Sequence, residues 1–171
     1  MARNKYQNMS EIEYFRALQK DVPEMIRGMR TSDFCHVIEK HHNRKQEEMR
    51  TLCIGDRTDK GSFYGRRDVL LEELKKILLK HTDKIIDMLV YLERDITISQ
   101  PIPEDFPLYT NVYRYGRGHD WRKGPLQANE LRIILARDML QKGNFFVITA
   151  FPCVMGDQPY VYDRPKKTGT D

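Results

Sequence analysis

The chain has 171 residues, of which 40% are hydrophobic and 32% are charged. This length suits one domain with a helical extension, and this composition is typical of a folded globular protein rather than a disordered one. No apolar run reaches the roughly 18 residues of a membrane span, and the N-terminus lacks the apolar segment of a secretory signal. We therefore expect no membrane association and no signal peptide.

Three cysteines, Cys35, Cys53 and Cys153, are scattered singly along the chain. They form neither a CxxC motif nor an even-numbered disulfide framework, so we interpret them as packed thiols. The sequence contains no zinc-type ligand set, no P-loop and no GxSxG motif. It predicts neither a metal site nor a cofactor.

Helices are predicted in the first half of the chain. Ser10 to Glu13 form a capping box that opens the first helix, which we expect Val22-Pro23 to break or restart. A cap at Thr31 to Asp33 opens a second helix that runs to about Leu52. We interpret residues 53–67 as a glycine-containing loop. A long third helix follows, from about Asp68 to Leu92, with a turn at His81.

After Arg94, prolines and glycines exclude long helices and β-prone runs take over. The predicted strands are Ile96–Ser99, Asn111–Tyr115, Leu131–Arg137 and Phe145–Phe151, with an edge strand at Tyr160–Tyr162. Helices first and strands last predict an α+β fold: N-terminal helices packed on a C-terminal twisted antiparallel sheet of about four strands.

The last two predicted strands are joined through Gly143-Asn144, which is the pattern of a hairpin. The second strand carries a polar Thr149 within an apolar run, and Pro152 is expected to close it. A hydroxyl in such a strand faces either the backbone of a neighbouring strand or a ligand. The sequence leaves these alternatives open.

Between Phe106 and Asp138, six basic residues stand against three acidic ones, and aromatic side chains lie among them. Cations neutralise phosphates and aromatic rings stack on bases, so this mixture suits contact with nucleic acid. An ordinary solvated surface explains the composition equally well. The candidate contacts are Arg114, Arg117, Trp121 and Arg122.

His36, His41 and His42 form one cluster on the second predicted helix. Spacings of five and six do not place two histidines on one helix face, which argues against a helical metal site. RNA cleavage needs no metal if a base takes the proton of the 2′-hydroxyl, an acid protonates the leaving oxygen, and cations or hydroxyls bind the phosphoryl oxygens. Histidine, arginine and threonine supply these groups, although a structural histidine is the more common case.

The order of short motifs resembles the RNase A-like toxin domains of bacterial contact-dependent inhibition and polymorphic toxins, part of a ribonuclease group with barnase-like, EndoU-like, colicin-type and RelE-like members. The resemblance covers about Ser32 to Val154. The motifs are His36-Val-Ile-Glu-Lys-His41, Glu48-Met49-Arg50, Gly61-Ser62-Phe63, Asn111–Gly118 and a final run ending in Thr149-Ala-Phe-Pro152.

The resemblance implies a metal-independent endoribonuclease that leaves a cyclic phosphate. It implies that His41, or alternatively His36, handles protons. The phosphate-binding arginine falls on Arg50 or on Arg57, and the family threonine falls on Thr149. Phe151 stands where the family commonly has tyrosine, so a hydroxyl is missing there unless Tyr160 or Tyr162 replaces it.

The resemblance further implies an RNA substrate, a cognate immunity protein, and delivery into the cytoplasm of a target cell. It predicts a helical extension or linker over residues 1–31, a toxin domain over 32–163 and a polar tail over 164–171. Two alternatives remain: an RNA- or partner-binding module with a degenerate site, and an unrelated protein in which the Thr149 strand is only part of the core.

Overall fold

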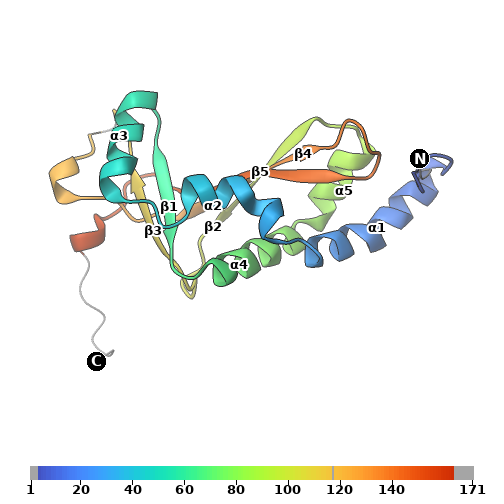
Figure 1. Cartoon of the computed structure of the whole chain (residues 1–171), viewed down its shortest axis with the longest axis horizontal. Helices are drawn as coiled ribbons and strands as arrows, with labels where there is room; N and C mark the ends of the chain where they lie inside the picture. The colour runs from blue at the N-terminus through green and yellow to red at the C-terminus, as the bar shows by residue number, and fades with distance from the viewer. Residues whose placement is uncertain (1–3, 117, 164–171) are drawn as a thin grey trace. The chain divides into compact units, whose positions relative to one another are not determined.

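The computed structural model describes residues 4–116 and 118–163 and shows an α+β fold (Figure 1). The α-helices are α1 (Glu11–Arg27), α2 (Cys35–His41), α3 (Gln46–Asp56), α4 (Arg67–Lys80) and α5 (Thr82–Val90). The strands are β1 (Lys60–Tyr64), β2 (Asp95–Pro101), β3 (Tyr109–Tyr113), β4 (Glu130–Arg137) and β5 (Phe145–Cys153). Single 3-10 turns, η1 to η3, span Thr31–Phe34, Trp121–Lys123 and Val161–Asp163. None of the described helices is both long and apolar enough to cross a membrane.

The α+β class predicted from the sequence is confirmed, with the described strands divided between two antiparallel sheets. β1 pairs with β3 in a register that runs from Lys60 opposite Tyr113 to Tyr64 opposite Tyr109. The other sheet has the order β2-β4-β5. The predicted hairpin joins β4 to β5, and the Asp138 amide donates to the Asn144 carbonyl at its turn.

The chain folds into two compact units. Unit 1 comprises Met1–Glu39, Arg66–Ile98 and Ile133–Ala150. Unit 2 comprises Lys40–Gly65, Ser99–Arg132 and Phe151–Asp171. The chain passes from one unit to the other within α2, β2, β4 and β5, so each of these elements has residues in both, and it passes once more between β1 and α4.

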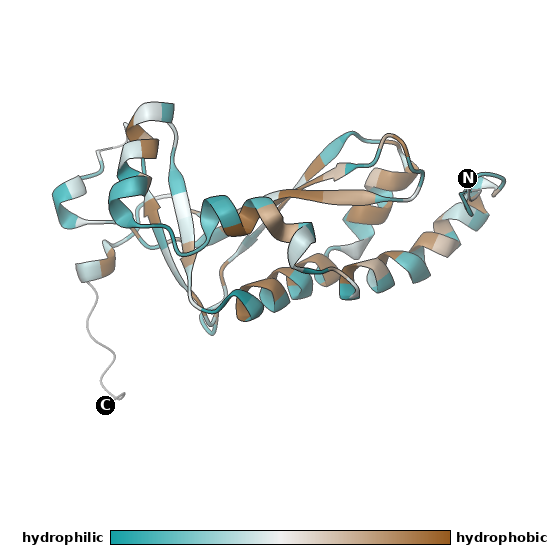
Figure 2. Ribbon diagram, in the orientation of Figure 1, coloured by the Kyte–Doolittle hydropathy of each residue, from teal (hydrophilic) through white to brown (hydrophobic). Residues whose placement is uncertain are grey.

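Unit 1 contains α1 packed along α4 and α5 (Figure 1). Hydrophobic and hydrophilic residues alternate along these helices (Figure 2), as expected where one face of a helix is buried. The Ser10 capping box is present: the Ser10 amide donates to Glu13 Oε2 at 2.8 Å, and the Glu13 amide donates to Ser10 Oγ at 3.3 Å. The long third helix is confirmed as α4 and α5, with its break at His81.

The predicted break at Pro23 is wrong, because α1 continues through it to Arg27. Leu18, Val22 and Ile26 recur every four residues and are fully buried on either side of the proline. Proline in a helix interior costs about 3 kcal/mol, and burying three aliphatic side chains offsets that at roughly 1.5–3 kcal/mol each.

The prediction of one helix from Thr31 to about Leu52 is also wrong. α2 ends at His41, and Asn43 adopts a left-handed conformation with φ 51° before α3 begins at Gln46. The Asn43 amide donates to the Phe63 carbonyl at 2.8 Å instead of continuing the helix. A hydrogen bond to a distant part of the chain thus ends the helix where helical periodicity alone would continue it.

The region predicted as a loop, residues 53–67, contains the end of α3 and strand β1. Pro152 does not close β5, which runs on to Cys153. β5 is the terminal strand of its sheet, where proline is tolerated because an edge position needs no amide donor. The predicted edge strand at Tyr160–Tyr162 reduces to a single bridge between Tyr160 and Leu126, followed by η3.

Small clusters of buried side chains lie in the described part of unit 2. Val112, Leu126, Ala128 and Val154 form one. Met49, Cys53 and Tyr113 form another, and Tyr64 and Trp121 pack against it. Of the three cysteines, Cys53 is buried and Cys153 partly buried, whereas Cys35 is exposed and not the packed thiol that was expected.

Candidate functional site

His41 is the last residue of α2, and its imidazole is held by the backbone of β1. Its Nδ1 lies 3.0 Å from the carbonyl oxygen of Gly61. A carbonyl oxygen can only accept a hydrogen bond, so Nδ1 carries the proton in this contact. In the neutral ring, Nε2 is then the nitrogen with the lone pair, which is the atom that a general base uses.

The backbone around His41 is tied to the next residue of β1, Ser62, which is fully buried. The Ser62 hydroxyl donates to the carbonyl of His41 at 3.2 Å and accepts from the amide of Arg44 at 3.1 Å. Buried polar groups cost stability unless they are hydrogen-bonded, and this hydroxyl satisfies two backbone groups at once. The turn that follows α2 is therefore fixed by a strand that lies twenty residues further along the chain.

Tyr64, the last residue of β1, and Gly65, which follows it, reinforce this turn. His42 Nε2 donates to the Gly65 carbonyl at 2.9 Å. The Asn43 side chain both donates to that carbonyl and accepts from the Gly65 amide, at 3.2 and 3.1 Å. The Tyr64 hydroxyl donates to the Arg44 carbonyl at 2.6 Å. These hydrogen bonds hold the segment from His41 to Arg44 in one conformation.

Phe151, in the part of β5 that belongs to unit 2, packs against the His41 ring. The two ring centroids are 5.7 Å apart and the ring planes are inclined by 39°. Aromatic contacts of this kind contribute about 0.5–1.5 kcal/mol and restrict rotation of the imidazole. The phenyl ring offers no hydrogen-bond donor here.

The other residues predicted to act in catalysis lie in different settings. His36 is exposed on α2, five residues before His41. The Arg50 guanidinium lies 5.9 Å from the centre of the Trp121 ring, so the structure brings together two residues that the sequence pointed to separately. Arg57 follows α3 in a left-handed conformation with φ 54°.

The structure shows the surroundings of Thr149, whose hydroxyl was expected to face either a neighbouring backbone or a ligand. Its hydroxyl oxygen is buried and makes no hydrogen bond to any part of the chain that the structure describes. It therefore does not bond to the backbone of a neighbouring strand. Unsatisfied buried hydroxyls are uncommon and call for an explanation, of which a ligand contact is one.

The predicted nucleic-acid contacts differ in how accessible they are. Arg114 is largely covered: its side chain is 14% exposed, donates to the Gly156 carbonyl at 3.0 Å and lies 3.9 Å from Asp59. Arg122 is 90% exposed and pairs with Asp120 at 3.1 Å. Arg117 lies outside the described residues. Of the two described arginines, Arg122 is the one that a bound strand can reach directly.

Neither unit carries a net charge over its described residues. Acidic and basic side chains are equal in number over residues 4–116 and 118–163, so the net charge of +4 is contributed by residues outside these ranges. Basic residues outnumber acidic ones between Phe106 and Asp138, but Arg114, Arg122, Arg132 and Arg137 all make ion pairs or hydrogen bonds within the protein.

His119 was not singled out from the sequence, yet it organises the loop that carries Arg114 and Trp121. Its Nδ1 accepts from the Arg114 amide at 2.9 Å, and its Nε2 donates to the Gly124 carbonyl at 2.8 Å. The ring stacks on Tyr113 at 5.4 Å. With both nitrogens bound to backbone, His119 is a structural residue, and only a tertiary contact reveals this.

The Cys153 thiol and the Tyr113 hydroxyl of unit 2 are neutral near pH 7. Burial raises the pKa of the Cys153 thiol to about 11 and that of the Tyr113 hydroxyl to about 12. Cys153 is therefore not a thiolate nucleophile. No group of three or more His, Cys, Asp or Glu side chains within the described ranges could hold a metal ion.

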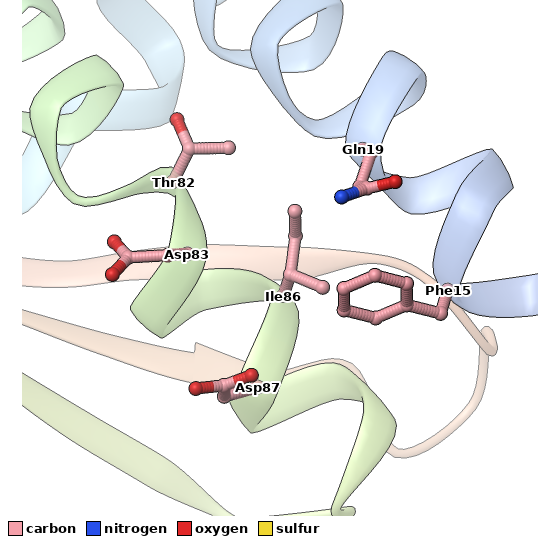
Figure 3. A pocket seen from close by; sticks show the side chains of 6 residues that line it. All are labelled: Phe15, Gln19, Thr82, Asp83, Ile86 and Asp87. Atoms are coloured by element: carbon pink, nitrogen blue, oxygen red, sulfur yellow. The ribbon is translucent and has the colours of Figure 1, made fainter.

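A hollow of about 320 Å³ lies in unit 1 between α1 and α5 (Figure 3). Phe15 and Ile86 face each other in it, and Gln19, Thr82, Asp83 and Asp87 complete the lining. It contains none of the residues that the sequence pointed to and no histidine or cysteine.

No protein-family model and no curated protein matches this chain. Among solved structures, the fold is similar to a chain of a CdiA-CT/CdiI complex from Y. kristensenii 33638, with a TM-score of 0.53 and 20% sequence identity. The match covers 69% of this chain and 98% of that chain. At this identity the likeness shows the fold alone: the chain has a fold found in a contact-dependent inhibition toxin–immunity complex.

Proposed function

We propose that this chain is the toxin of a contact-dependent inhibition pair and acts as a metal-independent endoribonuclease, with its toxin domain over residues 32–163. The observation that carries the proposal is the His41 imidazole, which Gly61 holds through Nδ1. This arrangement prepares Nε2 for proton transfer. The fold shared with a chain of a CdiA-CT/CdiI complex supports the biological setting.

In the proposed reaction, His41 Nε2 takes the proton of the 2′-hydroxyl. The 2′-oxygen attacks phosphorus, the bond from phosphorus to the 5′-oxygen breaks, and the leaving oxygen takes up a proton from water. The His41 imidazolium then returns its proton to the solvent. The products are a 2′,3′-cyclic phosphate and a free 5′-hydroxyl. A positioned acid or base contributes about 10²–10⁴-fold to such a step, which sets the effect expected on removing His41.

Phosphate and strand binding are assigned to residues whose accessibility differs. Arg50 is proposed to bind phosphoryl oxygens, since guanidinium forms charge-assisted hydrogen bonds with phosphate. The family resemblance gives Thr149 the same role, which requires that its hydroxyl, buried in the structure, becomes accessible when RNA binds. Arg122 and Trp121 are proposed to contact the strand. Arg114 is proposed to shape the loop that carries them, because its guanidinium is already bound to Gly156.

The proposed partners are an RNA substrate and an immunity protein made by the producing cell. We propose that the toxin is delivered to a target cell and acts in its cytoplasm. Electrostatic complementarity speeds association, so an acidic immunity protein is expected if it covers the arginine-rich loop from Arg114 to Lys123.

The catalytic proposal is tested with purified protein, total RNA and EDTA. We expect cleavage by the wild type and a loss of about 10²–10⁴-fold in His41→Ala. His36→Ala is the matched control, because His36 is an exposed histidine on the same helix; it is expected to keep most of the activity. If the wild type cleaves nothing that His41→Ala leaves intact, the catalytic proposal is wrong.

Expression in bacteria distinguishes a toxin from its immunity partner. Induced wild-type chain is expected to arrest growth, and the His41→Ala variant is expected to be tolerated. Unimpaired growth on expressing a folded wild-type chain contradicts the toxin proposal. Rescue of cells from a second toxin would instead identify the chain as an immunity protein.

A second candidate is a binding module with a degenerate site on the same fold, which the phenyl ring of Phe151 beside His41 favours. This alternative predicts RNA binding that weakens with salt, without turnover. Arg122→Ala is expected to weaken that binding, and Arg117→Ala to add to the effect. Affinity measured at two salt concentrations, alongside the cleavage assay, separates the two functions.

A further inference from the structure

We propose that Gly61 is a positioning residue for His41. It fixes the imidazole in the Nδ1–H tautomer and permits the contact with Phe151, while acting on no substrate atom itself. The role in catalysis rests on the proposed function, whereas the tautomer can be measured without any reaction.

His41 Nδ1 donates a hydrogen bond to the Gly61 carbonyl, at 3.0 Å. The acceptor is a backbone group of a paired strand, with Gly61 opposite Val112 of β3, so it cannot rotate away as a side chain would. Ser62, the next residue, binds the His41 carbonyl. Two successive residues of β1 thus hold both the ring and the backbone of His41, which leaves the ring one orientation.

The close approach of Pro152 requires glycine at position 61. A Cβ on Gly61 would lie 2.1 Å from the Pro152 carbonyl oxygen and 3.0 Å from its Cγ. The first distance is far below any real carbon–oxygen contact, and the atom involved is backbone. The Gly61 backbone approaches Pro152 this closely only because it carries no side chain.

The close contact between Gly61 and Pro152 also affects the His41 imidazole. Pro152 directly follows Phe151, whose ring lies 5.7 Å from that of His41. Any displacement of β1 from Pro152 therefore disturbs two contacts on His41 at once: the Gly61 carbonyl at Nδ1 and the Phe151 ring on its face. One glycine determines both.

The other histidines of unit 2 provide an internal comparison. His42 and His119 donate through Nε2, to the carbonyls of Gly65 and Gly124. Their neutral rings are thus Nε2–H tautomers, the opposite of His41. The structure predicts that these histidines do not share one tautomer, and that His41 differs from the other two.

The tautomers are measured by long-range ¹H–¹⁵N correlation NMR on the full chain with ¹⁵N-labelled histidine, at a pH above the imidazole titrations. We expect a protonated Nδ1 for His41 and a protonated Nε2 for His42 and His119, with signals assigned by single His→Gln variants. A protonated Nε2 on His41 overturns the proposal. An Nδ1–H signal from a chain that does not cleave RNA supports the positioning of His41 and counts against the proposed function.

Gly61→Ala tests the glycine itself. We expect a mixture of His41 tautomers, a fall in kcat of about 10–100-fold with little change in KM, and a displaced acid limb of the pH–rate profile, as for a weakened general base. Gly55→Ala is the matched control, because a Cβ there meets nothing within 4 Å. It is expected to leave kcat and the tautomers unchanged.

Phe151→Leu keeps the proposal testable if Gly61→Ala fails to fold. It leaves the Gly61 carbonyl in place, so His41 is expected to remain Nδ1–H while kcat falls several-fold through a less restricted ring. A Gly61→Ala protein that is folded and keeps both the Nδ1–H tautomer and the wild-type kcat overturns the proposal. Loss of the Nδ1–H tautomer in Phe151→Leu also does so, since it would assign that tautomer to the phenyl ring.

Discussion

In unit 1 the buried side chains of α1, α4 and α5 are aliphatic or aromatic and recur at helical spacing. In unit 2 the segment from His41 to Arg44 is held by backbone carbonyls, a buried serine and an asparagine in a left-handed conformation. Apolar burial is non-directional and tolerates small shifts, whereas hydrogen bonds and close backbone approaches do not. Unit 1 is therefore suited to stability, and unit 2 to holding a reactive side chain in one orientation.

The largest stability effect is expected from the core of unit 1. Leu18→Ala, at a fully buried position of α1, should lower the free energy of unfolding by about 2–5 kcal/mol through lost burial and the cavity left behind. Urea unfolding measures the change. Ile12→Ala on the exposed face of the same helix is the control and should change stability by less than about 1 kcal/mol. Equal effects of the two variants would show that α1 is not packed as the structure has it.

Ser62→Ala is the corresponding variant in unit 2. It leaves the Arg44 amide and the His41 carbonyl without their partner, which should cost about 1–3 kcal/mol. Hydrogen exchange should show faster exchange at the Arg44 amide in particular. Thr51→Ala, which removes an exposed hydroxyl in α3, should change neither quantity appreciably. Unaltered protection of the Arg44 amide would show that the Ser62 hydrogen bonds do not hold the segment from His41 to Arg44.

Phe151→Tyr sharpens the comparison at the His41 ring. A hydroxyl added there can donate to a phosphoryl oxygen, and a hydrogen bond worth about 1.4 kcal/mol corresponds to about a tenfold increase in the rate of RNA cleavage. The readout is the initial rate with wild-type His41 and again in the His41→Ala background. A hydroxyl that contributes to the same reaction should give no comparable increase without His41; an equal gain in both backgrounds would place it elsewhere.

The smallest effect concerns Asp138, the polar group that closes the β4–β5 hairpin in unit 1. Its pKa is lowered, chiefly because the Leu140 amide donates to the carboxylate, with further donors from Asn144 and Gln141. A lowered folded-state pKa gives stability that is complete above the unfolded value of about 3.9 and is lost as the pH falls through the folded value.

Asp138→Asn should therefore be less stable than the wild type by about 1 kcal/mol at neutral pH, and the difference should shrink as the pH drops below about 4. Thermal unfolding across this range measures it. Asp87→Asn, at an exposed position of α5, should show no such convergence. A difference that stays constant with pH would mean that the Asp138 charge contributes nothing to the hairpin.

Periodicity predicted unit 1 well because the burial of α1, α4 and α5 follows a regular helical repeat. The hairpin of β4 and β5 was equally readable, from two apolar runs and the Gly143-Asn144 turn. The break predicted at Pro23 is wrong because the burial of Leu18, Val22 and Ile26 on either side of the proline outweighs its local preference. The error at Pro152 arose similarly, since a strand-breaking residue was tolerated at a sheet edge.

The candidate site was predictable only in part. His41 was named from the sequence, but β1, which holds it, was mistaken for a loop because Gly61 and Ser62 are poor strand formers. Their value lies in what they meet: the Pro152 backbone and the His41 carbonyl. His119 was overlooked because a histidine between Gly118 and Asp120 has no local pattern that indicates its two backbone contacts.

The sequence by itself determined the α+β class, the buried helix faces and the residue types available for proton transfer and phosphate binding. These follow from side-chain chemistry and from spacing along the chain. Only the tertiary structure decided where α2 ends, which nitrogen of His41 carries the proton, and that the Thr149 hydroxyl is buried without a partner among the described residues. Each of these depends on atoms brought near from distant parts of the chain, and no local pattern encodes that proximity.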